Sequence, residues 1–380
     1  MDKALLALIK ISRTVGKNGQ LTQGGSGNTS VKMAPDQVEG GKFMFIKASG
    51  TAIGDMSAKK GWRRMRLGKV RGIIEDKKLS KLSSKKREAQ IARRLLAACS
   101  DNTKGNYRPS IESNLHSFLD KCVIHLHPTA VGAFINSKNG KTELQKLFAM
   151  EKFPLLWVPY ANPGYGLAKK LLVLCRRYEK KYGRLPQIVF LQKHGLLISA
   201  ATEKEAIGLV SITIERCKKK LSMPAVKKDK KPDAKTIKAV KLIIKDVFSR
   251  NMGKNEQVHF YNNKIISIFA NYADTKRLLQ SGPLEPGEIV YCNGPAVWLE
   301  ETEKNQIADV LKKQIKKRGK SPAAFLVKKV GLFVIGTAKS ASVVRQVVSS
   351  SLFVRYNAQK FGGISALTKA EQNFIYNCGA

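Results

Sequence analysis

The chain has 380 residues, 43% of them hydrophobic, and its 69 Lys and Arg against 28 Asp and Glu give a formal net charge of +41. This length predicts two domains, and since no apolar run reaches about 18 residues, a membrane-spanning helix is not expected. The six cysteines are scattered without a CxxC pair, which argues against a disulfide framework or a cysteine-rich zinc site and predicts a cytoplasmic protein.

Helices and strands are expected to alternate in the N-terminal part of the chain. Apolar residues at helical spacing predict helices at residues 3–14 and 88–99. Apolar runs predict strands at residues 42–48, 121–127 and 188–194. The charged sequence that follows the short apolar start predicts no signal peptide.

Turn and cap residues add the connections between these elements. The glycine-rich residues 24–30 predict a turn, and a second small-residue loop follows the strand at 42–48. Ser110 predicts the N-cap of a helix that continues to residue 119. Thr202 and Glu205 have the spacing of a capping box, which predicts a helix that reaches about residue 221.

A lysine-rich stretch with two prolines, residues 218–235, has the composition of a linker. It predicts a metal-binding catalytic domain at residues 1–222, a linker at 223–235 and a C-terminal α/β domain at 236–380. The sequence shows no internal repeat. The elements expected in the C-terminal domain are helices at 239–248, 302–317 and 340–356, strands at 264–270 and 288–292, a β-hairpin at 323–335, and a short last helix capped by Thr368.

Three of the five histidines have a pattern typical of a metal site. His125 and His127 occupy positions i and i+2 of a predicted strand, so both imidazoles are expected on one face. His194 stands at the end of another predicted strand, before a glycine. Three histidine ligands leave one coordination position open, as in catalytic zinc sites. His-x-His alone is more often an ordinary pair of polar residues at a sheet edge, and His194 together with a nearby carboxylate favours the metal.

That carboxylate is Glu112, which follows Ser110 at the predicted helix start. Free backbone N–H groups at a helix start attract anions, and a glutamate there also simply complements the helix dipole. Beside a metal ion, the same carboxylate could act as a general base and acid. The glycine-rich turn and the loop at residues 49–51 offer further N–H groups and hydroxyls to a phosphate.

Several short motifs follow one another in the order found in the class II aldolase/adducin family, which the first 220 or so residues resemble. The matching motifs are Gly27-Asn28-Thr29-Ser30, Lys47-Ala48-Ser49-Gly50-Thr51, Pro109-Ser110-Ile111-Glu112, His125-Leu126-His127, Pro159-Tyr160-Ala161 and His194-Gly195. The resemblance implies an α/β fold in three layers, αβα, around a mixed and mainly antiparallel central sheet, with a smaller C-terminal α/β region.

The resemblance also implies a role for each matching residue. His125, His127 and His194 would hold Zn²⁺ or another divalent metal, and Glu112 would be the acid/base. Tyr160 would be a further catalytic residue that reaches a neighbouring subunit's site in a homotetramer. The substrate phosphate would be held by four positions, Asn28, Ser49, Gly50 and Ser110. Adducin-like members lack metal ligands, whereas this chain has a histidine at every ligand position.

One departure and several further matches indicate a particular branch of the family. Ile111 stands where fuculose-phosphate aldolases have a second serine, and the motif is more similar to the aldolase half of long bacterial enzymes that join rhamnulose-phosphate aldolase to a dehydrogenase. Residues 281–284 and 331–333 also resemble that branch, which makes the C-terminal domain aldolase-like as well. No glycine-rich dinucleotide fingerprint follows a predicted strand, so no nucleotide cofactor and no dehydrogenase activity are expected.

The sequence therefore predicts a metal-dependent aldehyde-lyase of carbohydrate metabolism that cleaves a ketose 1-phosphate by retro-aldol chemistry. A sugar-phosphate epimerase or dehydratase would use the same ligands. An alternative of another class is a basic module that binds nucleic acid or acidic partners through the +41 charge. The basic residues are spread along the chain, which is not typical of a nucleic-acid footprint and equally fits a general basic bias.

Overall fold

The computed structural model describes most of the chain, namely residues 2–33, 41–101, 107–226, 232–252 and 256–378. The chain forms two compact units. Unit 1 comprises Met1–Ile135, Gly140–Lys220 and Asn373–Ala380, and unit 2 comprises Asn136–Asn139 and Leu221–Gln372. Residues 227–231 of the predicted linker lie outside the described residues, and the domain limits expected from the sequence stay a prediction.

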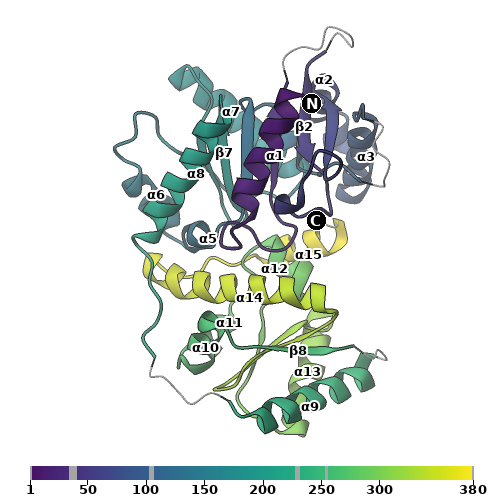
Figure 1. Cartoon of the computed structure of the whole chain (residues 1–380), viewed down its shortest axis with the longest axis vertical. Coiled ribbons are helices and arrows are strands. Elements are labelled where there is room, and N and C mark those ends of the chain that lie inside the picture. The colour runs from purple at the N-terminus through teal and green to yellow at the C-terminus, as the bar shows by residue number, and fades with distance from the viewer. Residues whose placement is uncertain (1, 34–40, 102–106, 227–231, 253–255, 379–380) are drawn as a thin grey trace. The chain divides into compact units, whose positions relative to one another are not determined.

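Unit 1 is built on a mixed sheet of seven strands within the described residues (Figure 1). Its order is β3-β2-β1-β4-β7-β6-β5, and every neighbouring pair is antiparallel except β5 and β6. The strands are β1 (Asn28–Lys32), β2 (Phe43–Lys47), β3 (Trp62–Arg66), β4 (Cys122–Leu126), β5 (Leu156–Val158), β6 (Ile188–Leu191) and β7 (Gly195–Ala200).

Helices cover both faces of this sheet. On one face lie α1 (Lys3–Gly16), α5 (Thr129–Ile135) and α8 (Glu203–Lys218), with α6 (Gly140–Leu147) beside them (Figure 1). On the other face lie α2 (Leu67–Glu75), α3 (Ser84–Ala97), α4 (Ser113–Ser117) and α7 (Tyr165–Tyr182). The expected three-layer α/β class with a mixed central sheet is therefore confirmed.

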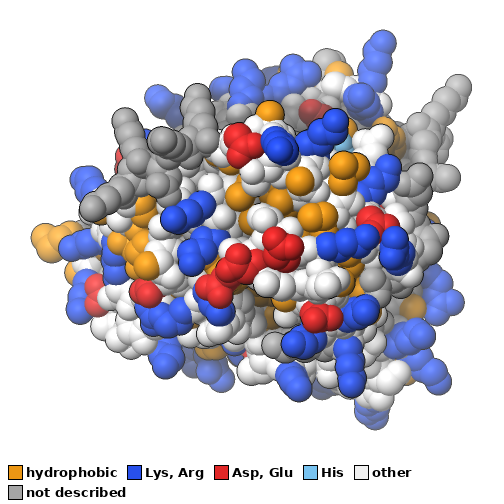
Figure 2. Space-filling model, turned by 90° about the horizontal axis from the view of Figure 1, so that it is seen from below, with side chains coloured by type: hydrophobic (Ala, Val, Ile, Leu, Met, Phe, Trp, Pro, Cys, Tyr) orange, Lys and Arg blue, Asp and Glu red, His pale blue; other side chains and the backbone are white. Residues whose placement is uncertain are grey.

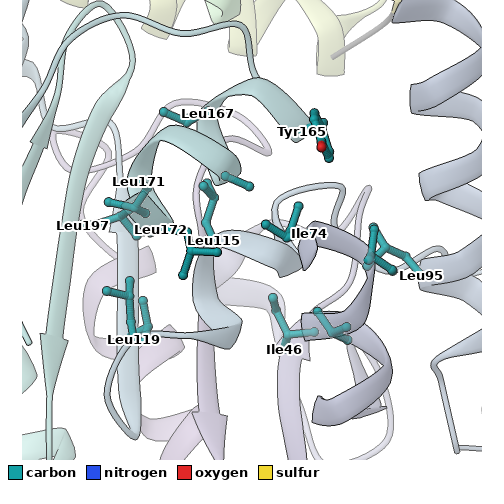
Figure 3. Packing of buried hydrophobic residues seen from close by; sticks show 14 of the residues in the cluster. Ile46, Ile74, Leu95, Leu115, Leu119, Tyr165, Leu167, Leu171, Leu172 and Leu197 are labelled. Carbon is teal, nitrogen blue, oxygen red and sulfur yellow. The ribbon is translucent and has the colours of Figure 1, made fainter. Parts of the chain in front are cut away.

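The core beneath α2, α3, α4 and α7 explains why these helices pack as they do. Their apolar stripes meet alternate residues of the strands, as the period of 2 requires. Figure 3 shows such side chains directed into one interior, among them Ile46 of β2, Ile74 of α2 and Leu171 of α7. Val123 of β4 belongs to the same cluster. Because side chains alternate along a strand, His125, two residues further along β4, lies on the same face of the sheet.

Unit 2 has a smaller sheet, for which the described residues give four strands in the order β8-β11-β10-β9. The strands are β8 (Val258–Tyr261), β9 (Val297–Leu299), β10 (Ala324–Val327) and β11 (Gly331–Ile335). The helices are α9 (Ala234–Met252), α10 (Lys264–Asn271), α11 (Thr275–Gln280), α12 (Pro286–Cys292), α13 (Lys304–Arg318) and α14 (Ala338–Ala358), and α15 (Lys369–Cys378) follows them in the chain. The smaller α/β region expected near the C-terminus is present.

The sheet of unit 2 repeats one part of the sheet of unit 1. The order and directions of β8-β11-β10-β9 are those of β4-β7-β6-β5, with one parallel pair at the end of each. The helices between the equivalent strands follow in a similar sequence, except that α12 has no counterpart. The expectation of no internal repeat is wrong at the level of topology.

Two strands predicted in unit 2 are helices. Residues 264–270 form α10, whose first turn is capped by the Asn263 side chain, which accepts from the N–H of Ile266 at 3.0 Å. Residues 288–292 belong to α12, which begins with Pro286 and places the Glu288 carboxylate on the N–H of Leu284 at 2.7 Å. A short apolar run does not distinguish a helix from a buried strand. In both segments, the residues at the helix start favour the helix.

Other elements agree with the sequence to within a few residues. The helix expected at 3–14 is α1, and Thr202 caps α8 by accepting from the N–H of Glu205 at 3.2 Å. The expected hairpin at 323–335 is formed by β10 and β11. Among the described helices, none has both the length and the apolar character needed to cross a bilayer.

Candidate metal centre

His125 lies in the centre of the seven-stranded sheet, on β4, where it is fully buried. It pairs with Asn28 of β1 on one side and with Leu197 of β7 on the other. Its Nδ1 lies 3.1 Å from the carbonyl oxygen of Leu196. A carbonyl can only accept, so Nδ1 carries the proton and the lone pair of Nε2 is free for a ligand.

His127 and His194 reach the same place from two strand ends. His127 follows β4, two residues after His125. His194 belongs to the turn between β6 and β7, so the strand expected at 188–194 ends earlier, at Leu191, and Gly195 starts the next strand. A Cβ on Gly195 would lie 2.5 Å from the oxygen of Leu126 and 3.0 Å from both His125 Cε1 and His127 Cδ2. Only a glycine lets the turn approach the two rings this closely.

The three rings converge on one point. The Nε2 atom of His125 lies 3.1 Å from Nε2 of His194 and 3.1 Å from Nε2 of His127. Within the described part of the chain, these histidines form the group of side chains that could hold a metal ion. A tetrahedral ion with bonds of about 2.0–2.1 Å to nitrogen keeps its donors a little over 3 Å apart, so the observed spacing fits zinc or a similar divalent ion.

Burial keeps the imidazole rings of His125 and His127 neutral. It lowers the pKa of His125 to about 4 and holds the pKa of His127 well below its ordinary value. Both rings are therefore neutral near pH 7. A neutral imidazole has one unprotonated nitrogen, which can bind a metal ion without loss of a net proton from the ring.

Glu112 closes the open side of the three histidines. Its Oε1 lies 2.9 Å from Nε2 of His194, and its Oε2 lies 3.5 Å from Nε2 of His125. Burial opposes ionisation of this carboxyl, but the His125 imidazole and the hydrogen bond from His194 outweigh it and hold the pKa of Glu112 well below its usual range. The Asn28 amide donates to Oε2 at 2.8 Å and holds the carboxylate in place.

The helix expected to start at Ser110 is shorter than predicted. Ser110 Oγ does accept from the N–H of Glu112 at 3.2 Å, but α4 begins at Ser113 and ends at Ser117. Residues 111 and 112 form a turn, closed by a hydrogen bond from Ser113 N–H to Ser110 O at 3.0 Å. So short a helix has a small macrodipole, and any anion site here depends on the Ser110 hydroxyl and nearby N–H groups.

The four predicted phosphate residues lie on three neighbouring segments. Asn28 begins β1 rather than belonging to the predicted turn, and its amide donates to Ser110 Oγ at 3.1 Å. Ser49 and Gly50 form an exposed loop after β2, and Ser49 N–H donates to the oxygen of Arg108 at 2.8 Å. The bridge between Ala48 and Pro109 places this loop alongside Ser110.

Tyr160 lies beside the turn that carries His194. Its N–H donates to the Gln192 side chain at 3.1 Å, and the Lys193 ammonium lies 5.4 Å from its ring. Its hydroxyl donates to Asn162 at 3.4 Å. A catalytic role for Tyr160 stays a prediction.

One buried side chain near the site received no role from the sequence. Lys47 ends β2 and is only 2% exposed. Its ammonium donates to the carbonyl oxygen of Gly25, in the turn before β1, and to that of Thr51, in the loop after β2. A lysine within an apolar strand, directly before Ala-Ser-Gly-Thr, was the signal that could have identified it.

The sequence of residues 7–221 matches the family model of the class II aldolase and adducin N-terminal domain. The chain belongs to this family. That range contains the three histidines, Glu112 and the whole seven-stranded sheet. Family membership accounts for the fold of unit 1, and the reaction has to be argued from the site.

Comparison with individual proteins gives more distant similarities. A curated relative from Bacillus subtilis (strain 168), the uncharacterized oxidoreductase YuxG, is 27% identical over 207 residues, which are 54% of this chain and 27% of the relative. The chain thus spans about a quarter of that protein's length.

Two solved structures are similar as well. The N-terminal class II aldolase domain of a conserved protein from Thermoplasma acidophilum is 24% identical, with 58% of this chain and 94% of that chain covered at a TM-score of 0.48. The L-fuculose-1-phosphate aldolase from Thermus thermophilus is 14% identical, with 57% and 91% covered at a TM-score of 0.33.

Proposed function

We propose that the protein is a zinc-dependent aldehyde-lyase that cleaves a ketose 1-phosphate, similar to rhamnulose or fuculose 1-phosphate, into dihydroxyacetone phosphate and an aldehyde. The observation that carries the proposal is the convergence of three imidazole Nε2 atoms with an ionised carboxylate, Glu112, on the remaining side. Three imidazole donors and one adjacent base are the set that metal-assisted proton chemistry on a hydroxyketone requires.

His125, His127 and His194 would hold the ion. When bound, the ion supplies Lewis acidity that polarises the oxygens of the substrate. The backbone carbonyl of Leu196 keeps the His125 ring in the tautomer that leaves Nε2 free. Gly195 lets the strand pass close enough for the rings to meet.

Glu112 would handle the proton. Cleavage removes a proton from the hydroxyl beside the scissile bond and adds one to the carbon that retains the bonding electrons. The ionised Glu112 carboxylate is able to accept the first proton and, once protonated, to return it to that carbon. The Asn28 amide, at 2.8 Å from Oε2, orients the carboxylate so that Oε1 is the atom that exchanges the proton.

The phosphate of the substrate would lie against Asn28, Ser110 and the loop of Ser49 and Gly50. Gly50 has φ +79°, a backbone conformation that favours glycine, and it lies exposed in this loop. The strong positive charge of the chain favours approach of an anionic substrate. On the face seen in Figure 2, Lys and Arg side chains are spread between apolar and acidic ones, which fits general attraction of anions better than one dedicated nucleic-acid surface.

The test begins with metal analysis of the purified protein, followed by incubation with L-rhamnulose 1-phosphate and L-fuculose 1-phosphate. Release of dihydroxyacetone phosphate, detected by coupled reduction, supports the lyase. An epimerised or dehydrated product would assign another reaction to the same site. A protein without metal that binds nucleic acid with a steep salt dependence would overturn the enzyme proposal in favour of a binding module.

The variant Glu112→Gln separates metal binding from proton transfer. Its turnover should fall by about 10²–10⁴-fold, because an amide cannot exchange the proton, while the three histidines keep the metal. Metal content and steady-state rates measure the two effects. Glu143→Gln is a matched control, since Glu143 pairs with Lys146 on the surface at 2.8 Å and should change neither. Full turnover by Glu112→Gln would exclude the role given to Glu112.

A further inference from the structure

Three residues on one face of β1 contact the segment that carries Glu112. The Asn28 amide donates to Glu112 Oε2 at 2.8 Å. Two residues further along the strand, Ser30 Oγ lies 2.8 Å from Nδ1 of His116. After two more residues, Nζ of Lys32 donates to the carbonyl oxygen of His116 at 2.7 Å. Alternate residues of β1 therefore contact Glu112 and the helical turn that follows it.

The spacings of the two segments match. Residues i and i+2 of a strand lie about 6.6–6.8 Å apart, and residues i and i+4 of a helix lie about 6 Å apart along its axis. The first two contacting residues of β1 are two positions apart, and Glu112 and His116 are four apart, so both contacts form at once. Lys32 continues the pattern, because its Nζ also donates to the carbonyl oxygen of Asp120, four residues after His116, at 2.5 Å.

The contact between Ser30 and His116 is made by two fully buried polar side chains. Burial holds the pKa of His116 well below its ordinary value, so its ring is neutral near pH 7. Its second nitrogen, Nε2, is also buried and has no hydrogen-bond partner among the described residues. An unpaired buried polar atom costs free energy that an apolar side chain would not. Packing alone therefore does not explain a histidine at this position.

Apolar contacts also hold this segment, but they do not fix the place of Glu112. Leu115 and Leu119 belong to the apolar core (Figure 3). The hydrophobic effect is non-directional and depends on the area that is buried, whereas a hydrogen bond requires a narrow range of distances and angles. The contact between Ser30 and His116 therefore fixes the rotation and height of the helical turn that begins at Glu112.

We propose that Ser30 and His116 are positioning residues for Glu112: their contact holds the helical turn so that the Glu112 carboxylate reaches the three histidines. This inference rests on the proposed function, because it assumes that Glu112 is the acid/base. Glu112 Oε1 lies 2.9 Å from Nε2 of His194, and a misplacement of about 1 Å at a reacting group can cost about 10²-fold in rate. Loss of the contact should therefore lower kcat and leave the metal in place.

The experiment compares Ser30→Ala with Ser12→Ala in the full-length, metal-loaded protein. Ser12 is a matched control, because it is also fully buried and its Oγ lies 2.7 Å from Oγ1 of Thr29, the neighbour of Ser30 in β1. Thr29 faces the opposite side of the sheet. Each variant thus removes one buried hydroxyl contact to the same strand, and only Ser30→Ala removes it from the face of Glu112.

Steady-state cleavage of a ketose 1-phosphate, metal analysis and hydrogen exchange supply the readout. The kcat of Ser30→Ala should fall by about 10–100-fold, with KM changed by no more than about twofold, whereas Ser12→Ala should keep the wild-type kcat. Metal content should not change in either variant. Exchange of the backbone N–H groups at residues 113–117 should accelerate in Ser30→Ala and not in Ser12→Ala.

A double variant separates positioning from a general structural role. In Glu112→Gln the carboxylate is already lost, so the addition of Ser30→Ala should not lower the residual kcat further. If Ser30 acted on stability or on the three histidines, its loss would lower the residual kcat again. That result would overturn the proposal.

The outcomes also separate this inference from the function on which it rests. If the wild-type protein cleaves no ketose 1-phosphate, the role of Glu112 is wrong and its positioning by Ser30 falls with it. If the wild type cleaves the substrate and Ser30→Ala has the same kcat as Ser12→Ala, the function stands and the inference is overturned. Should Ser30→Ala not fold, His116→Met removes the contact from the other side, and a wild-type kcat in that variant overturns the inference in the same way.

Discussion

The turn between β6 and β7 in unit 1 and the turn between β10 and β11 in unit 2 have the same backbone. Lys193 and Lys329 both adopt a left-handed conformation, with φ of 55° and 59°. The next residue donates its N–H to the last residue of the preceding strand at 3.1 Å in each case. Gly195 and Gly331 then begin the second strand of each hairpin.

The surroundings of the two turns also correspond. The N–H of Lys193 donates to the oxygen of Ile135, the last residue of α5, at 3.0 Å. The N–H of Lys329 donates to the oxygen of Ala270, near the end of α10, at 2.9 Å. The helix after each hairpin is capped by a threonine.

The side chains at the turns differ completely. Strand register shows that Phe260 of unit 2 corresponds to His125 of unit 1. His125 pairs with Leu197, two residues after Gly195, and Phe260 pairs with Phe333, two residues after Gly331. By the same alignment, Asn262 corresponds to His127 and Val330 to His194. In unit 2 the Phe260 ring packs on Phe333 at 5.1 Å between centroids. The backbone that the two hairpins share, here called the hairpin frame, therefore forms in unit 2 without metal donors. In unit 1, the side chains of His125, His127 and His194 make it a candidate metal site.

The largest difference between the two turns is expected when the residue before the glycine, His194 in unit 1 or Val330 in unit 2, is replaced by alanine. His194→Ala should lower metal affinity by more than the roughly 100-fold that loss of an outer-shell partner costs, and turnover should fall with it. Val330→Ala should leave the metal content unchanged and destabilise unit 2 by about 1–3 kcal/mol, because Val330 is a buried apolar residue.

Metal titration and denaturant unfolding measure these two effects. If Val330→Ala released metal as readily as His194→Ala, the two turns would not differ in the way proposed. If His194→Ala kept its metal, the three-histidine site itself would be wrong.

A smaller effect is expected from adding a methyl group to each glycine. In Gly195→Ala the new Cβ would meet Leu126 O at 2.5 Å and both neighbouring histidine rings at 3.0 Å, so metal affinity should fall by about 10–100-fold and stability should decrease. In Gly331→Ala it would meet the Phe260 ring at 2.8 Å, with φ +145°, so stability should decrease while metal affinity stays the same. Metal titration of both variants gives the result, and equal affinities would contradict the comparison.

Much of the candidate site could be predicted from the sequence because its geometry is local. His125 and His127 are two residues apart in an extended segment, which places both rings on one side. The positions of Asn28 and Glu112 needed the three-dimensional structure. Strand register brings Asn28 opposite His125, and no local pattern specifies which strands are neighbours.

The errors in unit 2 have a related cause. The segment after Asn263 has buried apolar residues at Ile266, Phe269 and Ala270. This pattern fits a helix that packs one face on the core, and a short apolar run of this kind equally fits a buried strand. The repeat also escaped detection, since the two hairpins share a backbone but few side chains. The local traces of the repeat are a lysine and a glycine at equivalent places in each turn and the threonine that caps the helix after each hairpin.

The smallest expected effect tests what the two units have in common. Thr202 accepts from the N–H of Glu205 and Thr337 from the N–H of Ser340, each at 3.2 Å. Thr202→Ala and Thr337→Ala should each cost about 1 kcal/mol, because each exposes a donor at a helix start that the hydroxyl had satisfied. Hydrogen exchange should accelerate in α8 for the first variant and in α14 for the second, with metal content unchanged in both. A loss of metal in Thr202→Ala would mean that helix and site are coupled in unit 1, and the hairpin frame would then not be independent of the chemistry it carries.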